Sequence, residues 1–234
     1  MSELKVSDFK MLEKPPYKLP DPRTEIELVL MKSLKDEEKM YGPVFTTKLI
    51  NYTLQYVAQK YGEKPKEAIK TLDQLGAYLV SISNKYPKAF TAAIYAHLKV
   101  EKELQGSAGA GTRVGMMAFS RNLMKKPSAK ERNVDIDNLL TTFQQTLIPS
   151  RLAMEVGYKK NEDESVNVIY PDCPIKDACQ MASHEDALKR VIGGLQCVSC
   201  SGVCQILKLL SSYDWDYELL EFNKPHCIAR IFMV

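Results

Sequence analysis

The chain carries six cysteines, and none of them precedes residue 173. They are Cys173, Cys179, Cys197, Cys200, Cys204 and Cys227. Cysteine thiolates bind zinc and iron–sulfur clusters, attack electrophiles and form disulfides. A cluster of this kind therefore predicts metal or cluster ligation, disulfide bonds, or a set of buried or reactive thiols.

The spacing of the cysteines favours ligation. Cys197, Cys200 and Cys204 stand at i, i+3 and i+7, so their sulfurs line one face of a helix that reaches back to the first of them. Cys173 follows an expected strand and Cys227 begins another, so a bound metal would join three elements. Zinc and a cubane iron–sulfur cluster each need four ligands. We take all six cysteines as candidate metal ligands, with zinc favoured over an iron–sulfur cluster.

Two alternatives stay open beside ligation. The run Cys-x2-Cys-x3-Cys lacks the second Cys-x2-Cys pair of a zinc ribbon and does not have the ferredoxin spacing. Free cysteine is also among the most buried residue types, so the thiols could pack as small hydrophobic groups. The other alternative is that the cysteines form disulfide bonds, which persist only where the redox compartment allows them.

The three histidines are not expected to be ligands. His97 adjoins the apolar stripe of a helix and is interpreted as a boundary residue, and His184 is expected to be exposed at a helix start. His226 precedes Cys227 on a strand, where neighbouring side chains point to opposite faces. A Cys–His nucleophile pair formed by folding stays open.

The composition is that of an ordinary globular protein, with 45% hydrophobic and 26% charged residues. A formal charge of +3 is too small to indicate a polyanionic partner, so no nucleic acid is expected. The longest uncharged run, 191–207, is too short and polar to span a membrane, and residues 1–22 lack the apolar core of a secretory signal. The expected location is cytoplasmic.

Helices are expected to dominate the N-terminal two-thirds. Thr24 is positioned to cap a first helix that Gly42-Pro43 ends, and Pro43 to begin a second. Pro65 is expected to open a third helix that ends before Pro87, and a fourth runs to about Leu104. Further helices are expected at 112–125 and 135–147. Between them a GxGxxxG run at 109–115 lacks the preceding strand of a dinucleotide site and is interpreted as a hinge.

The remaining third has a different pattern. A solvated charge run at 162–165 is followed by an expected strand at 166–170 and helices from residue 183 to 193 and from 199 to 212. Strands at 213–222 and 226–234 are expected to form a closing hairpin. The fold class is therefore α+β, with a predominantly helical region packed with a small antiparallel sheet. We divide it into an extended arm (1–22), a helical region (23–160) and a Cys-rich α+β region (161–234) that forms one continuous domain with the helices.

Three segments of the last third, 170–174, 197–202 and 218–232, resemble the end of 4-vinyl reductase domains. The resemblance implies a TRAPP-subunit-like α+β fold that binds small, often hydrophobic molecules, with a cysteine-bound metal in some members. Phe222 and Asn223-Lys224-Pro225 stand where the family often has a cysteine and a turn glycine, so Cys227 alone represents the hairpin at a metal site. L-2-amino-thiazoline-4-carboxylate hydrolases are similar at the same hairpin.

The resulting functional hypothesis is a small-molecule binding protein, for a hydrophobic ligand, with a cysteine-ligated metal site and a sensing or carrier role. The alternatives are a thiol-dependent hydrolase that uses Cys197, Cys200 or Cys204, or an iron–sulfur reductase, so the question of an enzyme stays open. An interaction subunit is a third class, because TRAPP-like folds also assemble with partners. A homodimer is left open.

Overall fold

The computed structural model describes residues 4–13, 30–106, 136–137, 140–141, 144, 155–173, 175–179, 197–210, 213–221 and 226–234. Several predictions of the sequence lie outside these residues. They are the helix at 112–125, the GxGxxxG run, the helix at 183–193 with His184, and the turn at 223–225. Of the helix predicted at 135–147, the five described residues are helical.

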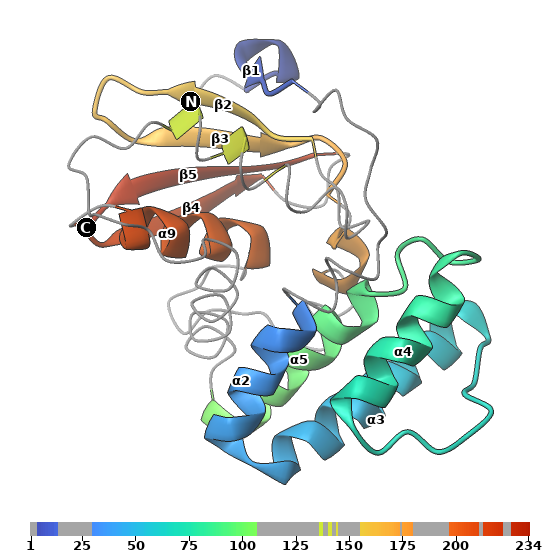
Figure 1. The fold of residues 1–234 in the computed structure, drawn as a ribbon. Helices are drawn as coiled ribbons and strands as arrows, with labels where there is room; N and C mark the ends of the chain where they lie inside the picture. Colours follow the sequence, from blue (N-terminus) through green and yellow to red (C-terminus); the bar gives the residue numbers. More distant parts are fainter. Residues whose placement is uncertain are drawn as a thin grey trace.

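Four helices form the layer drawn in the lower part of Figure 1. They are α2 (Lys32–Tyr41), α3 (Pro43–Tyr61), α4 (Leu72–Ser83) and α5 (Thr91–Gln105). The longest of them, α3, packs along α5 and also contacts α2 and α4. Gly42 has a φ of 74°, which a glycine adopts without strain, and Pro43 opens α3 as the sequence predicts.

The sequence pattern predicts that the third helix begins at Pro65, and this is wrong. The helix, α4, begins at Leu72. The hydroxyl of Thr71 accepts the backbone N–H of Gln74, and the side chain of Gln74 accepts the backbone N–H of Thr71, each over 3.2 Å. This capping box satisfies two backbone donors that a helix start leaves unpaired. The helix therefore starts where its cap lies, six residues after the proline.

Five antiparallel strands form one sheet, in the order β1-β2-β3-β5-β4. They are β1 (Lys10–Met11), β2 (Gly157–Lys160), β3 (Val166–Tyr170), β4 (Trp215–Glu221) and β5 (Cys227–Met233). The sequence predicts β3, β4 and β5 but not β1 and β2. In β2 the lysines at 159 and 160 are exposed, so this strand lacks an apolar run. The charge run at 162–165 is the tight β2–β3 connection, with Glu164 at a φ of 64°.

The two faces of the sheet have different partners. On one face Ile169 and Ile228, which pair across β3 and β5, pack with Phe9 from the segment before β1. On the other face Tyr170 pairs with Cys227, and both belong to the main core. The part of the predicted N-terminal arm that is described, residues 4–13, contributes a short 3-10 helix, η1 (Val6–Asp8), and the edge strand β1.

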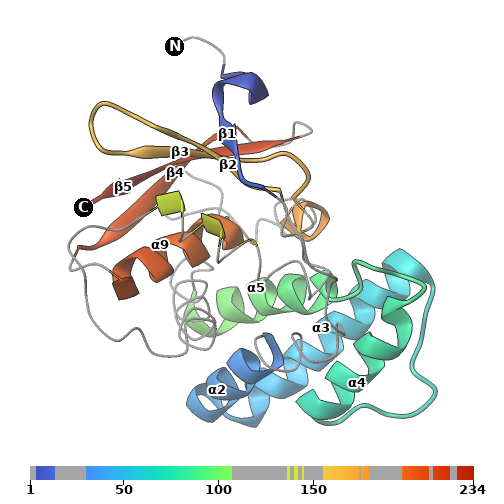
Figure 2. The same cartoon turned by 45° about the horizontal axis from the view of Figure 1, so that its top comes forward.

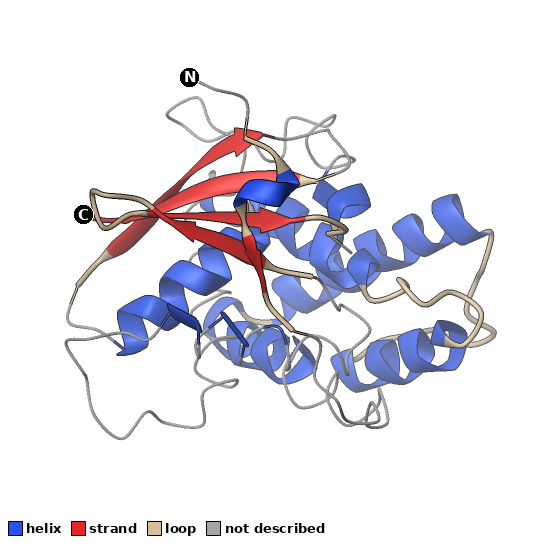
Figure 3. Cartoon of the chain, turned by 90° about the horizontal axis from the view of Figure 1, so that it is seen from above, coloured by secondary structure: helices blue, strands red, loops and turns tan. Residues whose placement is uncertain are grey.

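Helix α9 (Val198–Leu210) contacts β4 and β5 on the side of the sheet that faces the other helices (Figures 1 and 2). Seen from above, the strands form one layer and the helices gather beside and beneath it (Figure 3). One hydrophobic cluster contains buried residues of α3, α4 and α5 together with residues of α9 and the sheet. The α+β class is therefore confirmed. In the part of the chain that is described, no helix has the length and apolarity needed to cross a bilayer.

Candidate functional site

Cys197 lies at the N-terminus of α9, where it acts as the capping residue. Its sulfur accepts the backbone N–H of Cys200 over 3.4 Å, and its carbonyl accepts the N–H of Ser201 over 2.9 Å. Its own N–H donates to the hydroxyl of Tyr217 on β4 over 3.0 Å. The helix therefore begins just after Cys197, and the hydrogen bond to β4 holds this end of α9 against the sheet.

Two further thiols, those of Cys200 and Cys227, lie near Tyr170 at the end of the β3–β5 pair. Tyr170 is the last residue of β3 and stands directly across from Cys227, the first residue of β5. The thiol of Cys200 donates to the hydroxyl of Tyr170 over 3.8 Å. Burial, and then the nearby Cys200, raise the pKa of Tyr170 well above its ordinary value. The tyrosine hydroxyl is thus held neutral between α9 and the sheet.

Cys173 and Cys179 come from the segment after β3. Residues 176–179 are helical, and the N–H of Cys179 donates to the carbonyl of Ile175 over 3.0 Å. Both thiols are buried. Burial is the main cause that raises the pKa of Cys173 to about 12 and that of Cys179 well above its ordinary value. Neighbouring thiols raise both pKa values further: Cys197 acts on Cys173, and Cys173 followed by Cys197 acts on Cys179.

Cys197 is the neighbour that four other cysteines share. Besides Cys173 and Cys179, it raises the pKa of Cys200, and burial followed by Cys197 raises that of Cys227 to about 11. Cys197 therefore lies within electrostatic range of four thiols from three segments: the segment after β3, the start of α9 and the start of β5. We use the name thiol chamber for the set of these five residues: Cys173, Cys179, Cys197, Cys200 and Cys227.

Cys204 lies further along α9, next to Cys200. It is seven positions after Cys197, which is about 10 Å along the axis at 1.5 Å per residue. None of the six cysteines, all of which are described, forms a disulfide, and all are buried. Cys204 is therefore a neighbour of Cys200, and of the cysteines on α9 it lies farthest from Cys197.

The sulfurs are too far apart for a preformed zinc site. Zinc–sulfur bonds of about 2.3 Å hold four sulfurs about 3.8 Å apart in a tetrahedron. Although all six cysteines belong to the described residues, no three of their sulfurs lie within 4.8 Å of one another. In a cubane cluster each thiolate binds a different iron, so the sulfurs stand farther apart than around a single ion.

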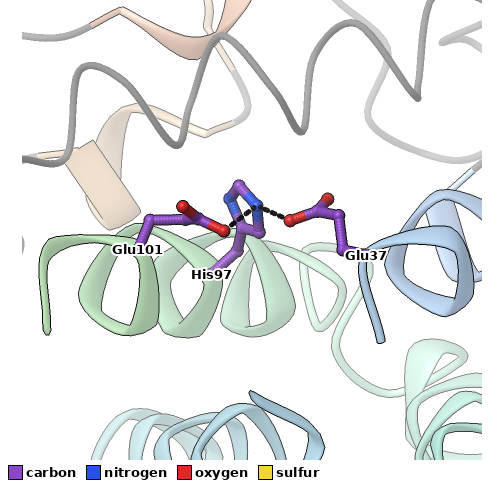
Figure 4. Close-up of side chains that lie close together, drawn as sticks. All are labelled: Glu37, His97 and Glu101. Carbon is purple, nitrogen blue, oxygen red and sulfur yellow. Dashed lines mark hydrogen bonds and ion pairs between the residues drawn. The ribbon is translucent and has the colours of Figure 1, made fainter. Parts of the chain in front are cut away.

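A second group of ligand types lies between α2 and α5 (Figure 4). His97 and Glu101 are one turn apart on α5, and Glu37 reaches them from α2. The Nε2 atom of His97 is 2.7 Å from Oε2 of Glu37 and 3.8 Å from Oε1 of Glu101. The exposed fractions of Glu37 and Glu101 are 1% and 0%. We call these three residues the Glu–His–Glu group.

Charge is shared unequally in this group. Burial lowers the pKa of His97, but the charge of Glu37 and its hydrogen bond outweigh burial and raise it. Burial raises the pKa of Glu101 to about 7, the charge of His97 opposes this rise, and the charge of Glu37 adds to it. Neither carboxylate oxygen of Glu101 has a hydrogen-bond partner among the described residues. The imidazolium of His97 therefore pairs with Glu37, and Glu101 is left without a full partner.

The interpretation of His97 as a boundary residue is wrong, because its ring is buried and paired with a carboxylate. The sequence contained one indication, since a histidine and a glutamate at i and i+4 lie on one helical face. Nothing local connects them to Glu37, sixty residues earlier. The other described histidine is His226, and its Nε2 atom lies 3.2 Å from Oε2 of Glu221, so it pairs with a carboxylate.

Comparisons with protein-family models, with curated proteins and with solved structures found no match to this chain. The resemblance to 4-vinyl reductase domains therefore stays a prediction. The chemistry of the chain has to be argued from its two buried groups, the thiol chamber and the Glu–His–Glu group.

Proposed function

We propose that the chain binds a cysteine-ligated metal cofactor in the thiol chamber. The observation that carries the proposal is that Cys197 raises the pKa values of four other buried thiols, one on the helix that Cys197 caps and three from two further segments of the chain. Four ligands complete either a zinc site or a cubane cluster, and the chamber offers five. Such a cofactor would join β3, α9 and β5 at their ends.

An iron–sulfur cluster is the favoured occupant, although the sequence alone favoured zinc. The described sulfurs form no group of three within 4.8 Å, whereas a single zinc ion holds its ligands closer than that. A cluster spreads its thiolate ligands over several iron atoms and suits the wider spacing. A zinc ion would require the sulfurs that bind it to move closer together.

The competing explanation is that the thiols are ordinary core residues. Cysteine packs as a small hydrophobic group, and the cysteines do belong to the main core. Packing alone gives no reason for four thiols from three segments to share Cys197 as a neighbour. Measured metal content separates the two explanations.

The environment of these thiols agrees better with a role as metal ligands than with a role as catalytic nucleophiles. A catalytic cysteine works as a thiolate, with a lowered pKa and some exposure. Here burial raises the pKa values of four thiols, namely Cys173, Cys179, Cys200 and Cys227. We therefore rank a thiol-dependent hydrolase below a metal-binding protein. An iron–sulfur reductase would use the same cluster and differs by its redox activity.

The small-molecule part of the hypothesis rests on the resemblance to 4-vinyl reductase domains. A hydrophobic ligand near the cofactor would make the protein a sensor or a carrier, because metal occupancy and ligand binding would affect each other. The identity of the ligand and the formation of a homodimer are parts of this proposal that need their own measurements.

The test is elemental analysis with an absorption spectrum on protein purified without oxygen. We expect iron with labile sulfide, and a broad absorption that disappears in Cys197→Ser. Cys204→Ser is the matched control, because this thiol also lies on α9 but about 10 Å from Cys197 along the axis. About one zinc per chain, without iron, would show that the cofactor is a zinc ion and not a cluster. If the protein holds neither iron nor zinc, even when iron and sulfide are supplied under reducing conditions, the proposal is refuted.

A further inference from the structure

Three ligand atoms of a kind that first-row metals prefer converge between α2 and α5. They are one carboxylate oxygen each of Glu37 and Glu101 and one ring nitrogen of His97, all within 4.8 Å of one another. In the close-up of Figure 4 the two carboxylates flank the imidazole from opposite sides. Metal–nitrogen and metal–oxygen bonds of about 2.1 Å hold tetrahedral ligands about 3.4 Å apart. The observed separations of 2.7 Å and 3.8 Å lie on either side of that value.

The charge of the group is a second and independent observation. Glu101 is completely buried, and in the described part of the chain neither of its oxygens accepts a hydrogen bond. A buried carboxylate without a hydrogen-bond partner is costly, and the nearest cation, His97, is 3.8 Å away and already bound to Glu37. One imidazolium can neutralise only one of the two carboxylates. A divalent cation would neutralise both and would leave His97 as a neutral ligand.

The surroundings hold the three side chains in place. The ring of Phe45 meets that of His97 edge-on at a centroid distance of 6.4 Å. The hydroxyl of Tyr41 accepts a hydrogen bond from Gln105, and burial with the charges of Glu101 and Glu37 raises the pKa of Tyr41. A phenol hydroxyl therefore lies near the two carboxylates as a further polar group.

We propose that Glu37, His97 and Glu101 form a binding site for one divalent first-row cation, such as Mn²⁺, Fe²⁺ or Zn²⁺. Imidazole with carboxylates suits these ions, whereas thiolates select softer metals and iron–sulfur clusters. The site is therefore chemically distinct from the thiol chamber and does not depend on the function proposed for it. Three protein ligands leave coordination positions for water or a substrate, as in catalytic rather than structural sites.

Manganese is the probe that separates the two sites, because it is a poor partner for thiolates. The protein as purified is titrated with Mn²⁺, and the free ion is counted by electron paramagnetic resonance. We expect about one bound Mn²⁺ per chain, and at least tenfold weaker binding in Glu101→Gln and in Glu37→Gln. Each substitution keeps the shape of the side chain and removes one charge. Glu103→Gln is the matched control on α5, because its carboxylate is bound to Lys48 on the outside of the helix.

Three results would overturn the proposal. The first is no Mn²⁺ binding by the unsubstituted chain at millimolar ion. The second is equal binding in the folded Glu101→Gln variant, with folding checked by circular dichroism. The third is loss of the ion in Cys197→Ser but not in Glu101→Gln, which would locate it in the thiol chamber. Electron spin echo modulation of the bound ion in the unsubstituted chain tests the same site without a variant: an imidazole nitrogen is expected, and its absence would exclude His97.

Discussion

The sulfur of Cys197 lies 3.4 Å from the backbone nitrogen of Cys200 and accepts its hydrogen bond, so the same thiol caps α9 and lies at the centre of the thiol chamber. A helix start leaves several N–H groups without partners, and a side-chain acceptor satisfies one of them. Capping and ligation are thus two separable roles of one residue.

Cys197→Ser should keep the cap and lose the ligand, because a serine hydroxyl is a good capping acceptor. In metal-free protein we expect Cys197→Ala to unfold more easily than Cys197→Ser, by about 1 kcal/mol, the usual value of a capping side chain. Urea unfolding of both variants measures this difference. Both variants should lose the metal. Equal unfolding free energies would show that the sulfur contributes nothing to the cap.

Alkylation of the thiols should be slow in the folded protein. Burial raises the pKa values of Cys173, Cys179, Cys200 and Cys227, so few thiolates form at neutral pH. Mass spectrometry after iodoacetamide treatment should find these residues unmodified, and fully modified once urea unfolds the chain. Labelling of any one of them at the rate of a free thiol would restore the nucleophile hypothesis.

The stability of the metal-free protein should fall as the pH rises toward 7 because of Glu101. Its pKa is about 7 in the folded chain, against about 4.3 for an unfolded glutamate. A raised folded pKa contributes stability that is complete below about pH 4 and is lost as the pH passes through 7. At about 1.4 kcal/mol per pKa unit, this difference of about 2.7 units corresponds to a loss of about 4 kcal/mol. The charged and titratable groups around this carboxylate are Glu37, His97 and Tyr41.

Glu101→Gln should flatten this dependence between pH 5 and pH 8, as urea unfolding at several pH values would measure. Glu103→Gln is the control, because hydrogen bonds from Lys48 and Tyr52 lower the pKa of Glu103. Its titration therefore lies below that range. The same slope in Glu101→Gln and in the unsubstituted chain would mean that Glu101 does not titrate there.

Gly157→Ala should destabilise the sheet at the β1–β2–β3 contact. A Cβ atom at Gly157 would lie 2.8 Å from Cγ2 of Ile169 and 3.2 Å from Cβ of Phe9. Overpacking of this kind costs about 1 to 3 kcal/mol. Thermal unfolding should register the loss, whereas Lys159→Ala, exposed on the same strand, should change stability by less than about 0.5 kcal/mol. Equal melting temperatures for the two variants would show that the neighbouring strands shift to accept the added methyl group without loss of stability.

Local sequence patterns were sufficient where one element carries its own evidence. Pro43 and the apolar period after it predicted α3, and the apolar runs at 226–234 and 166–170 predicted β5 and β3. They failed where local features compete or are weak. Pro65 marked a helix start less strongly than the capping box at Thr71, and the lysines of β2 concealed a strand that owes its place to its neighbours in the sheet.

The sequence by itself determined that the thiols cluster near one end of the chain and that helices precede a small sheet, because composition and periodicity are local properties. Only the tertiary structure decided which thiols meet. Pairing of β3 with β5 brings Tyr170 opposite Cys227, and the capping of α9 adds Cys197 and Cys200. It also decided that His97 meets Glu37, since contact between α2 and α5 depends on packing of apolar faces and not on any residue near the histidine.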